Sequence, residues 1–269
     1  MRRLVKPLSA ILIVAVLSLL VYSCKKDVKQ EQQQVEISSQ VLDRISALGF
    51  SKTNVQIHPE GYLVEGDIVL TENDLNNTPE MQFLRIAETE QYRTNNLVGS
   101  LPRSITVRVS TNLPSSYVTA TNETIRRYNA QNLRITFQRV TSGGNIVLSR
   151  APSGAGYLAS SGFPSGGNPY PSVRVNSAFL GSNPGTNYLA TILAHEIGHC
   201  IGFRHTDFMN RAYSCGGSPV NEGASSVGAI LIPGTPSGPD AGSWMLACIG
   251  NGQNRPFNTN DRTALNFLY

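Results

Sequence analysis

The chain has little net charge, few histidines and only a short hydrophobic run. Its 269 residues include 22 lysines and arginines and 18 acidic residues, which gives a formal charge of +4. Arg2, Arg3 and Lys6 fall in an amino-terminal leader, and without them about +1 remains. A nearly neutral protein offers no basic surface for a nucleic acid, so we expect no such partner. The apolar run from Leu8 to Tyr22 is shorter than the ~20 residues that span a bilayer.

The first 24 residues have the features of an export signal. A basic start is followed by the apolar run and then by Ser23 and Cys24. The segment resembles a bacterial lipoprotein signal peptide, although Tyr22 is bulkier than that pattern usually has. The resemblance implies cleavage before Cys24, lipidation of Cys24, and an exported protein anchored to a bacterial membrane, in the periplasm or at the cell surface. An uncleaved signal anchor is the alternative.

The cysteines are few and, after lipidation, odd in number. Export implies an oxidising compartment, in which cysteines tend to pair. With Cys24 acylated, Cys200, Cys215 and Cys248 remain, which permits one disulfide bond and one free thiol. Cys215 and Cys248 lie in loop-like sequence and are the favoured pair, while Cys200 suits a buried position on a helix. The sequence alone leaves this connectivity open.

Composition and periodicity divide the chain into four segments. Apolar residues make up 40% of the chain, which is ordinary for a packed globule. We predict a signal peptide, a lipidated cysteine with a polar tether, a small amino-terminal region and a main domain, with ranges 1–23, 24–34, 35–98 and 99–269. In the amino-terminal region, helical spacing predicts a helix over 35–50 and another near 80–92. Residues 61–71 are strand-like and are interrupted by Gly66.

For the main domain, the order of strand-like and helix-like segments predicts an α+β fold, with a mixed, twisted sheet and helices packed on one face. Alternating apolar residues mark the strands, and helical spacing marks the helices. The predicted order is strand 105–110, helix 115–130, strands 133–137 and 145–148, an edge strand within 154–160, strand 173–175 and a helix from Asn183-Pro184. A long loop over 211–243 and a short final helix, capped by Asn260 or Thr259, complete the chain.

The stretch HEIGHCIGFRH, residues 195–205, holds three of the four histidines. His195 and His199 are four apart, so on a helix they lie on one face and can share a metal ion. Gly202 can end that helix and let His205 return as a third ligand. Three imidazoles leave a fourth position for water, which distinguishes a catalytic zinc site from a structural one. Glu196 lies beside the metal, where it can act as a general base. A chance grouping of polar residues on a helix is the alternative.

The same stretch matches HExxHxxGxxH, the pattern of the metzincin zinc metallopeptidases. The HEIGH sequence, the HTDF at 205–208 and the lipoprotein-like start resemble the bacterial dual-action HEIGH metallopeptidase family. The resemblance implies a metzincin-like catalytic domain with an active-site helix, a methionine turn at Met245 and one catalytic zinc ion. It also implies an endopeptidase that hydrolyses protein or peptide substrates, and we expect a monomer. Two positions depart from related families: Ala247 replaces a tyrosine, and Thr206 replaces an acidic residue.

One segment of the amino-terminal region is also similar to a known pattern. VEGD at 64–67 is similar to the FxGD segment of astacin propeptides, whose aspartate occupies the open position of the zinc. The similarity implies that region 35–98 is a propeptide and that Asp67 is its zymogen switch, with Gly66 allowing close approach of the backbone. A Gly-Asp turn between two strands is the alternative. Metzincins bind peptides along an edge strand, which implies a substrate site near 154–160 and side-chain selection by loop 230–236.

Three functions are open at this point. The leading hypothesis is a membrane-tethered zinc endopeptidase. The second is a surface lipoprotein whose zinc domain serves as a binding or adhesion module with little turnover. Glu196 disfavours that reading, because a pure binding site has no use for a base beside the metal. The third is an amidase that uses the same chemistry on a cell-wall peptide.

Overall fold

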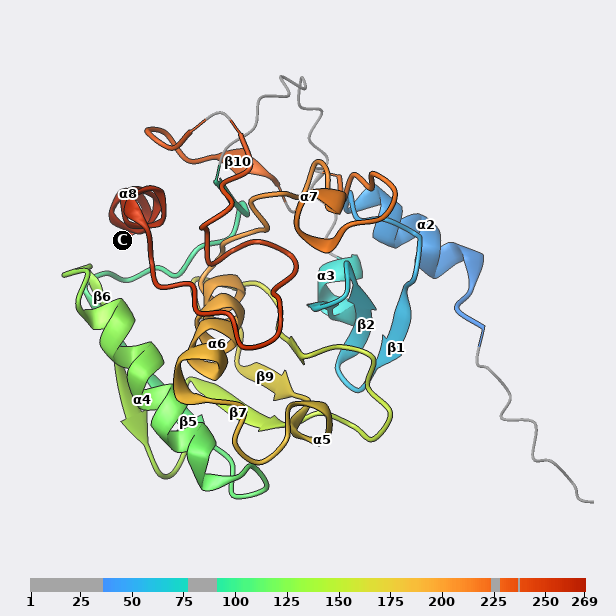
Figure 1. The fold of residues 1–269 in the computed structure, drawn as a ribbon. Coiled ribbons are helices and arrows are strands. Elements are labelled where there is room, and N and C mark those ends of the chain that lie inside the picture. The colour runs from blue at the N-terminus through green and yellow to red at the C-terminus, as the bar shows by residue number, and fades with distance from the viewer. Residues whose placement is uncertain (1–35, 77–90, 224–227, 237) are drawn as a thin grey trace, which may run out of the picture. The chain divides into compact units, whose positions relative to one another are not determined.

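A computed structural model gives the structure of residues 36–76, 91–223, 228–236 and 238–269 (Figure 1). The residues from Ile37 to Tyr269 form one compact unit. The predicted signal peptide, Cys24 and most of the tether lie outside the described residues, as does most of the helix expected at 80–92. Among the helices that are described, none combines the length and apolar character needed to cross a bilayer.

A five-stranded sheet lies at the centre of the fold, with its strands in the order β6, β5, β7, β9, β8. Their bounds are β5 (Arg103–Val109), β6 (Ile135–Val140), β7 (Ile146–Arg150), β8 (Ala159–Ser160) and β9 (Ser172–Val175). The first four in spatial order run parallel, and β8 pairs antiparallel with β9 at the edge. Ile105 and Val107 are buried as their alternation predicts. The predicted mixed sheet and α+β class are therefore confirmed.

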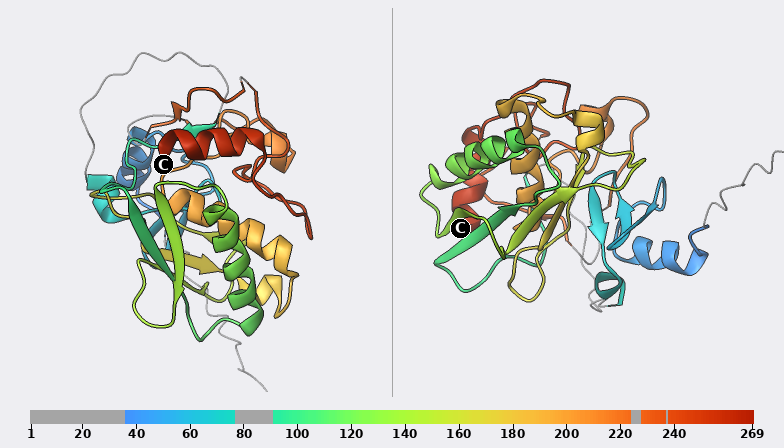
Figure 2. Two further views of the ribbon diagram at one scale, coloured as in Figure 1. Left: turned by 90° about the vertical axis from the view of Figure 1, so that its left-hand side faces the viewer. Right: turned by 90° about the horizontal axis from the view of Figure 1, so that it is seen from below.

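Two long helices pack against each other on one face of this sheet (Figures 1 and 2): α4 (Ser115–Asn129) and α6 (Thr186–Cys200). Buried hydroxyl groups of α4 join the two helices. The Tyr128 hydroxyl donates to the carbonyl oxygen of Ala194 at 2.7 Å. Because Ala194 directly precedes the histidine motif, this contact helps to fix the motif against the sheet.

The two ends of α6 set the direction of the chain around the motif. The helix begins two residues later than predicted, since Gly185 and not Asn183 is its N-cap residue. It ends at Cys200, and Gly202 follows with a φ of 110°. At this φ a side chain would be strained, and a Cβ would also lie 2.8 Å from the carbonyl oxygen of Asn96. The predicted helix stop at Gly202 is confirmed.

A short helix, α5 (Ser177–Leu180), precedes α6, and the carboxyl-terminal part that follows α6 has three elements: α7 (Ala212–Cys215), β10 (Ile230–Leu231) and α8 (Thr259–Leu268). Strand β10 pairs with β4 (Tyr92–Arg93), so residue 92 is in a strand and not at the end of a helix. The N-cap residue of α8 is Asn258, which forms a capping box with Asp261. The predicted caps at Thr259 and Asn260 were therefore wrong by one and two positions.

The amino-terminal region folds as a small antiparallel sheet with two helices, α2 (Ser39–Ala47) and α3 (Glu72–Asn76). Its strands are β1 (Gln56–His58), β2 (Gly61–Val64) and β3 (Ile68–Leu70), in that order. The strand predicted over 61–71 is therefore split into two, and its break lies at Gly66 as predicted. Figure 2 shows this small sheet, in cyan, beside the larger one.

The buried apolar residues form two clusters. The larger lies between the five-stranded sheet and its helices. The smaller is built almost wholly by the amino-terminal region, from Ile45, Leu48, Phe50, Val64, Ile68, Leu70, Leu75 and Phe163. Leu63 and Val69 face the larger cluster instead. Because side chains alternate along a strand, β2 and β3 present one face to each cluster.

Candidate metal centre

The histidine motif brings its three imidazoles to one point. Helix α6 carries His195 and His199 one turn apart, and the chain after Gly202 returns His205 to the same place. The ring centroids are 4.6, 4.9 and 5.2 Å apart in pairs, and all three side chains are buried. The Nε2 atoms of His195 and His199 are only 3.0 Å apart. All three predicted ligands therefore converge.

Each imidazole is held at its Nδ1 atom by an oxygen. The partners are the carbonyl of Trp244 for His195 (2.9 Å), the carbonyl of Phe203 for His199 (2.8 Å) and the carboxylate of Glu222 for His205 (3.0 Å). A carbonyl oxygen can only accept, so Nδ1 of His195 and of His199 carries the proton. Their Nε2 atoms then present lone pairs, which is the arrangement of metal-binding histidines.

The geometry fits a tetrahedral cation. Two lone pairs 3.0 Å apart repel unless a cation lies between them, and a hydrogen bond cannot replace it here because neither Nε2 has a proton to donate. Zinc-to-nitrogen bonds of 2.0–2.1 Å would place ligand atoms ~3.3 Å apart. The carboxylate Oδ2 of Asp67 is 3.2 Å from Nε2 of His205 and 3.4 Å from Nε2 of His195. Three nitrogens and one oxygen are a donor set that zinc takes.

The protonation of these groups agrees with that reading. Burial, together with the two neighbouring imidazoles, lowers the pKa of His199 well below its ordinary value, so this ring is a neutral ligand. Burial alone would also disfavour a charged His205, but the carboxylates of Asp67 and Glu222 outweigh burial and raise its pKa. The raised pKa means that His205 tends to hold a second proton, at Nε2. A cation at Nε2 would replace this proton, because it too would supply a positive charge near the carboxylates of Asp67 and Glu222.

Asp67 reaches the site from the turn between β2 and β3. Burial opposes its ionisation, yet the imidazoles of His205 and His195 outweigh this effect and hold the pKa of its carboxyl well below the usual value. Its second oxygen, Oδ1, is buried and has no hydrogen-bond partner among the described residues. An ionised buried carboxylate with a free oxygen is costly unless a cation lies beside it.

Gly66, directly before Asp67, allows this approach. It has a φ of 92°, and a Cβ there would lie 2.6 Å from Nη2 of Arg211. The Arg211 guanidinium donates to the carbonyl oxygen of Glu65, so it holds the backbone on which Asp67 is mounted. The close backbone approach predicted for Gly66 is therefore present.

Glu196 lies beside the three histidines and is buried. The hydroxyl of Ser161 donates to its Oε2 atom at 2.7 Å and to its carbonyl oxygen at 3.0 Å. Burial, and the nearby charge of Asp67, raise the pKa of the Glu196 carboxyl well above its ordinary value, and the Ser161 hydrogen bond opposes this. A carboxylate with a raised pKa is suited to taking up and releasing a proton near neutral pH.

Met245 lies under the motif helix, fully buried. Its sulfur is so close to α6 that a Cβ on Gly198 would be 2.5 Å away from it. Its carbonyl oxygen accepts a hydrogen bond from the amide of Thr206 at 2.9 Å, directly after the third histidine. Met245, where the resemblance implies a methionine turn, therefore packs against the helix that carries His195 and His199.

A buried group of charges surrounds the outer side of His205. Arg204 is fully buried, pairs with Glu65 at 3.0 Å and lies over the ring of Phe50 at 4.8 Å. Burial and the neighbouring Glu222 raise the pKa of the Glu65 carboxyl, and Arg204 opposes them. Sequence reasoning missed Glu65, Glu222, Arg204 and Ser161. No spacing signals them, because they come from four separate segments.

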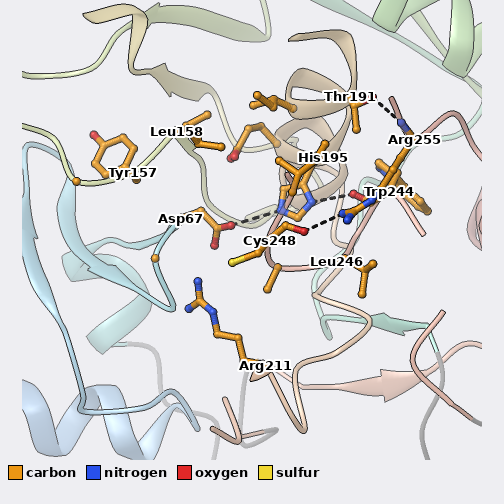
Figure 3. Close-up of a pocket in the computed structure, with 17 residues that line it drawn as sticks. Asp67, Tyr157, Leu158, Thr191, His195, Arg211, Trp244, Leu246, Cys248 and Arg255 are labelled. Carbon is orange, nitrogen blue, oxygen red and sulfur yellow. Dashed lines mark hydrogen bonds and ion pairs between the residues drawn. The ribbon is translucent and has the colours of Figure 1, made fainter. Parts of the chain in front are cut away.

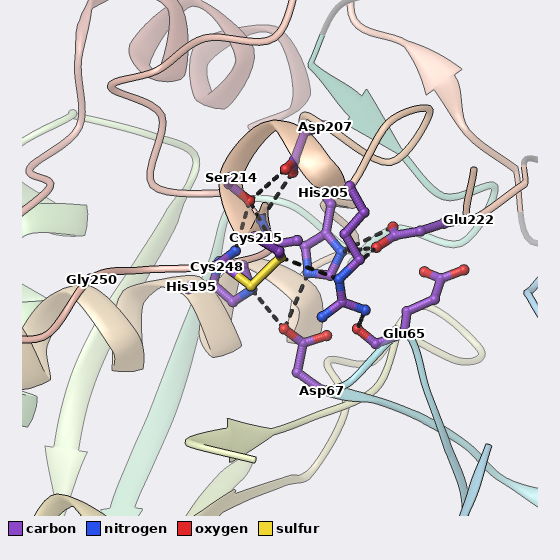
Figure 4. The surroundings of a disulfide bond; sticks show 12 residues. Glu65, Asp67, His195, His205, Asp207, Ser214, Cys215, Glu222, Cys248 and Gly250 are labelled. Atoms are coloured by element: carbon purple, nitrogen blue, oxygen red, sulfur yellow. Dashed lines mark hydrogen bonds and ion pairs between the residues drawn. A yellow bond between two sulfur atoms is a disulfide. The ribbon is translucent and has the colours of Figure 1, made fainter. Parts of the chain in front are cut away.

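A disulfide bond joins Cys215 and Cys248, the pair that the sequence favoured, and Cys200 is a buried free thiol (Figure 4). Next to this bond, the Asp207 carboxylate accepts hydrogen bonds from the amide of Ala247 at 2.9 Å and from the hydroxyl of Ser214. These contacts tie the segment after Met245 to the segment after His205. The disulfide therefore closes one wall of the site.

A cavity of about 250 Å³ opens from the histidines (Figure 3). It runs between α6, the chain before β8 and the residues that follow Met245. Residues 156–159 line it, in agreement with the predicted substrate edge within 154–160. None of the described residues of loop 230–236, which was expected to select side chains, lines this cavity, and Ile230 and Leu231 pair with β4. Residues 246–249 line it instead.

The match to a family model agrees with a metallopeptidase. Residues 62–269 match the model of a family described as dual-action HEIGH metallo-peptidase. A search of curated proteins gave no match. Among solved structures the chain is similar to myroilysin, with 15% identity and a TM-score of 0.42 over 64% of this chain and 82% of that one. It is also similar to a hatching-enzyme zinc-protease of the medaka fish Oryzias latipes, with 19% identity and a TM-score of 0.39 over 61% and 88% of the two chains.

Proposed function

The chain belongs to the dual-action HEIGH metallopeptidase family and is a metallopeptidase, and on this premise we propose that it is a zinc-dependent endopeptidase held latent by its own amino-terminal region. The observation that carries the zinc assignment is the convergence of three imidazole Nε2 atoms whose Nδ1 atoms are all engaged by oxygen. One catalytic ion accounts for this set, with His195, His199 and His205 as its protein ligands.

The chemistry follows from the groups around that position. A bound zinc ion supplies a Lewis acid, which lowers the pKa of a coordinated water toward ~7. Glu196 takes the proton of the attacking water and delivers it to the leaving amine. The Ser161 hydroxyl, 2.7 Å away, holds the carboxylate of Glu196 in place for both transfers. Substrate lies along the edge at β8, where the peptide backbone pairs with the strand.

Latency rests on the position of Asp67. Its carboxylate fills the fourth corner of the donor set, which is the position that water needs. The same segment also occupies the strand edge: the carbonyl oxygen of Asp67 accepts from the amide of Ser161 at 2.9 Å, and the amide of Val69 donates to the Ser161 carbonyl at 2.6 Å. The amino-terminal region therefore covers both the metal and the edge that an extended peptide would use.

Localisation is part of the same proposal. The lipoprotein-like start implies a lipid anchor at Cys24 and export to the periplasm or the cell surface of a bacterium. The disulfide between Cys215 and Cys248 supports export, because such bonds persist in oxidising compartments. Mass spectrometry of the amino-terminal peptide tests the anchor, and an unmodified cysteine there contradicts it.

Casein hydrolysis by the full-length chain tests the enzyme and its latency together. We expect little activity from the natural chain and much more from Asp67→Ala. A chelator should abolish the activity of Asp67→Ala, and added zinc should restore it. Asp43→Ala is the matched control, because Asp43 is an exposed aspartate of the same region. Glu196→Gln in the Asp67→Ala chain should lower the rate about 10²- to 10⁴-fold.

Each alternative has its own outcome. Zinc binding without hydrolysis of casein would favour the binding module, and release of peptidoglycan fragments in place of casein peptides would favour the amidase. An Asp67→Ala chain as inactive as the natural one, in which zinc is bound, would remove the latency proposal.

A further inference from the structure

The cavity has two ends of different character. Its carboxylates, Asp67 and Glu196, both lie at the metal-binding end. The walls beyond are apolar and include Ile192, Leu246 and Ile249. At the other end lies Arg255, next to Thr191, whose hydroxyl accepts from the Arg255 amide at 3.0 Å. Figure 3 shows Arg255 and Asp67 on opposite sides of His195.

The spacing along α6 between His195 and Thr191, which accepts from the Arg255 amide, suits one side chain. Thr191 is one helical turn before His195, which corresponds to about 6 Å along the axis of α6. A mostly apolar cavity that also carries a guanidinium group suits a single side chain with a polar end.

The Arg255 guanidinium is held in place but not neutralised. Nη1 donates to the carbonyl oxygen of Cys248 at 2.8 Å, and Nη2 donates to Oε1 of Gln253 at 3.2 Å. Three of its five N–H groups have no partner among the described residues, and no described carboxylate lies within the 4.0 Å of an ion pair. Burial lowers the pKa of Arg255 below its ordinary value, although the charge of Asp207 opposes this.

The second arginine of the cavity is used differently. Arg211 donates to the carbonyl oxygen of Glu65 and lies against Gly66, so in the latent chain it binds the amino-terminal segment. Among the described residues, Arg255 makes no hydrogen bond or ion pair with that segment. If Asp67 withdraws, the described lining residues carry one carboxylate, Glu196, and two guanidinium groups, Arg211 and Arg255. The cavity would then favour a negatively charged side chain.

Resting on the proposed function, we propose that Arg255 selects substrates with a carboxylate side chain next to the scissile bond. An aspartate or glutamate side chain that enters the cavity beside the metal places its carboxylate against the free N–H groups of Arg255. The fixed guanidinium then forms charge-assisted hydrogen bonds at little further cost in side-chain entropy. A lysine or arginine side chain would meet a like charge in an apolar pocket and be rejected. Acidic proteins and peptides are therefore the preferred class of substrate.

Matched peptides test this preference. The full-length chain with Asp67→Ala is assayed on quenched fluorescent peptides that differ only in Asp against Asn, or Glu against Gln, at each position around the cut, with the cut located by mass spectrometry. We expect kcat/KM to be about tenfold or more higher for the acidic member at one position beside the cut, the scale of one charge-assisted hydrogen bond.

Variants assign that preference to a residue. Arg255→Gln should abolish the acidic preference while the neutral peptides are still cut, Arg255→Lys should keep part of it, and Arg255→Glu should turn it toward lysine. A purely structural role for Arg255 would slow acidic and neutral peptides alike. Arg139→Gln is the matched control, because Arg139 is exposed on β6 at the far edge of the sheet.

A binding measurement separates this inference from the proposed function. Trp244 is the chain's one tryptophan and lines the cavity, so its fluorescence reports peptide binding to the Asp67→Ala, Glu196→Gln chain. Hydrolysis without an acidic preference, or with one that Arg255→Gln leaves intact, overturns the inference alone. Selective binding of acidic peptides without any hydrolysis by the active chain overturns the proposed function alone. Neither hydrolysis nor selective binding overturns both.

Discussion

The amino-terminal region and the metal-binding region are each held together by apolar packing, but the contacts between them are largely charged. Both turns of the small sheet deliver carboxylates into the larger region. Glu60, between β1 and β2, accepts from Arg174 at 2.6 Å, and also from Ser172 and Tyr170. The turn between β2 and β3 delivers Glu65 and Asp67.

Under the proposed latency, this difference explains how one chain can be both stably folded and inhibited. Water can replace a polar contact when two surfaces separate, whereas an exposed apolar surface has no such substitute. Leu63 and Val69 add an apolar contribution across the boundary. The remaining apolar residues of the small sheet serve their own cluster, so the region can keep its fold while its carboxylates leave the metal site.

The largest effect should come from the buried ion pair that joins the two regions. Arg204→Met leaves the carboxylates of Glu65 and Glu222 buried without their guanidinium, and we expect a loss of about 3–5 kcal/mol in the free energy of unfolding. Arg174→Met, at the half-exposed pair with Glu60, should cost no more than about 1 kcal/mol. Urea unfolding at fixed zinc concentration measures both. Equal losses would contradict the distinction between the two turns.

Two isoleucines of equal burial compare the two clusters. Ile45→Ala in the smaller cluster and Ile105→Ala in the larger should each cost about 2–5 kcal/mol locally, because each leaves a cavity. We expect Ile45→Ala to make the amino-terminal region sensitive to added trypsin and to raise casein hydrolysis by the intact chain. Ile105→Ala should not raise hydrolysis, and in the Asp67→Ala chain it should lower it. The same outcome for both variants would show that the two clusters unfold as one.

The two sides of His205 provide the third comparison, since Asp67 faces its Nε2 atom and Glu222 its Nδ1 atom. Glu222→Gln removes the carboxylate that orients the ring, and we expect zinc affinity to fall about 10- to 100-fold. Isothermal titration with a competing chelator measures this. Asp207→Asn is the control, since Asp207 is a buried acid of the same segment whose carboxylate accepts from Ala247 and Ser214 and, among the described residues, from no histidine. Unchanged affinity would show that Glu222 has no part in the metal site.

The smallest effect should be a pH dependence at the boundary. His58 is buried at the edge of β1, and its Nε2 atom is 3.3 Å from the Ser160 hydroxyl. Burial and Arg174 lower its pKa in the folded chain, against the opposing effect of Glu60. The unfolded state therefore binds more protons between the two pKa values, so this part of the stability is present above pH ~6.5 and is lost as the pH falls below it.

His58→Gln tests this directly. The natural chain should lose more stability than His58→Gln between pH 7.5 and 5.5, as measured by the urea midpoint at each pH. Parallel losses in the two proteins would assign the pH dependence to other groups.

Local pattern was enough for the parts of this protein that lie within one segment. Helical spacing put His195, His199 and Glu196 on one helix, alternation located the strands of the larger sheet, and glycine's freedom at positive φ located the stop at Gly202 and the break at Gly66. These predictions succeed because they depend on neighbours along the chain. They erred at helix starts, where Gly185 and Asn258 cap helices that Asn183 and Asn260 were expected to cap.

The contacts between segments far apart in the sequence were decided by the tertiary structure alone. The pairing of Glu222 with His205, of Ser161 with Glu196 and of Arg204 with Glu65 leaves no periodic trace, and the same is true of Arg255 at the end of the cavity. Electrostatic and hydrogen-bonding energies depend on distance in space and on burial, and both are set by how the whole chain packs. The sequence therefore specifies the proposed metal ligands, while packing specifies their hydrogen-bond partners, the position of the Asp67 carboxylate and the pocket.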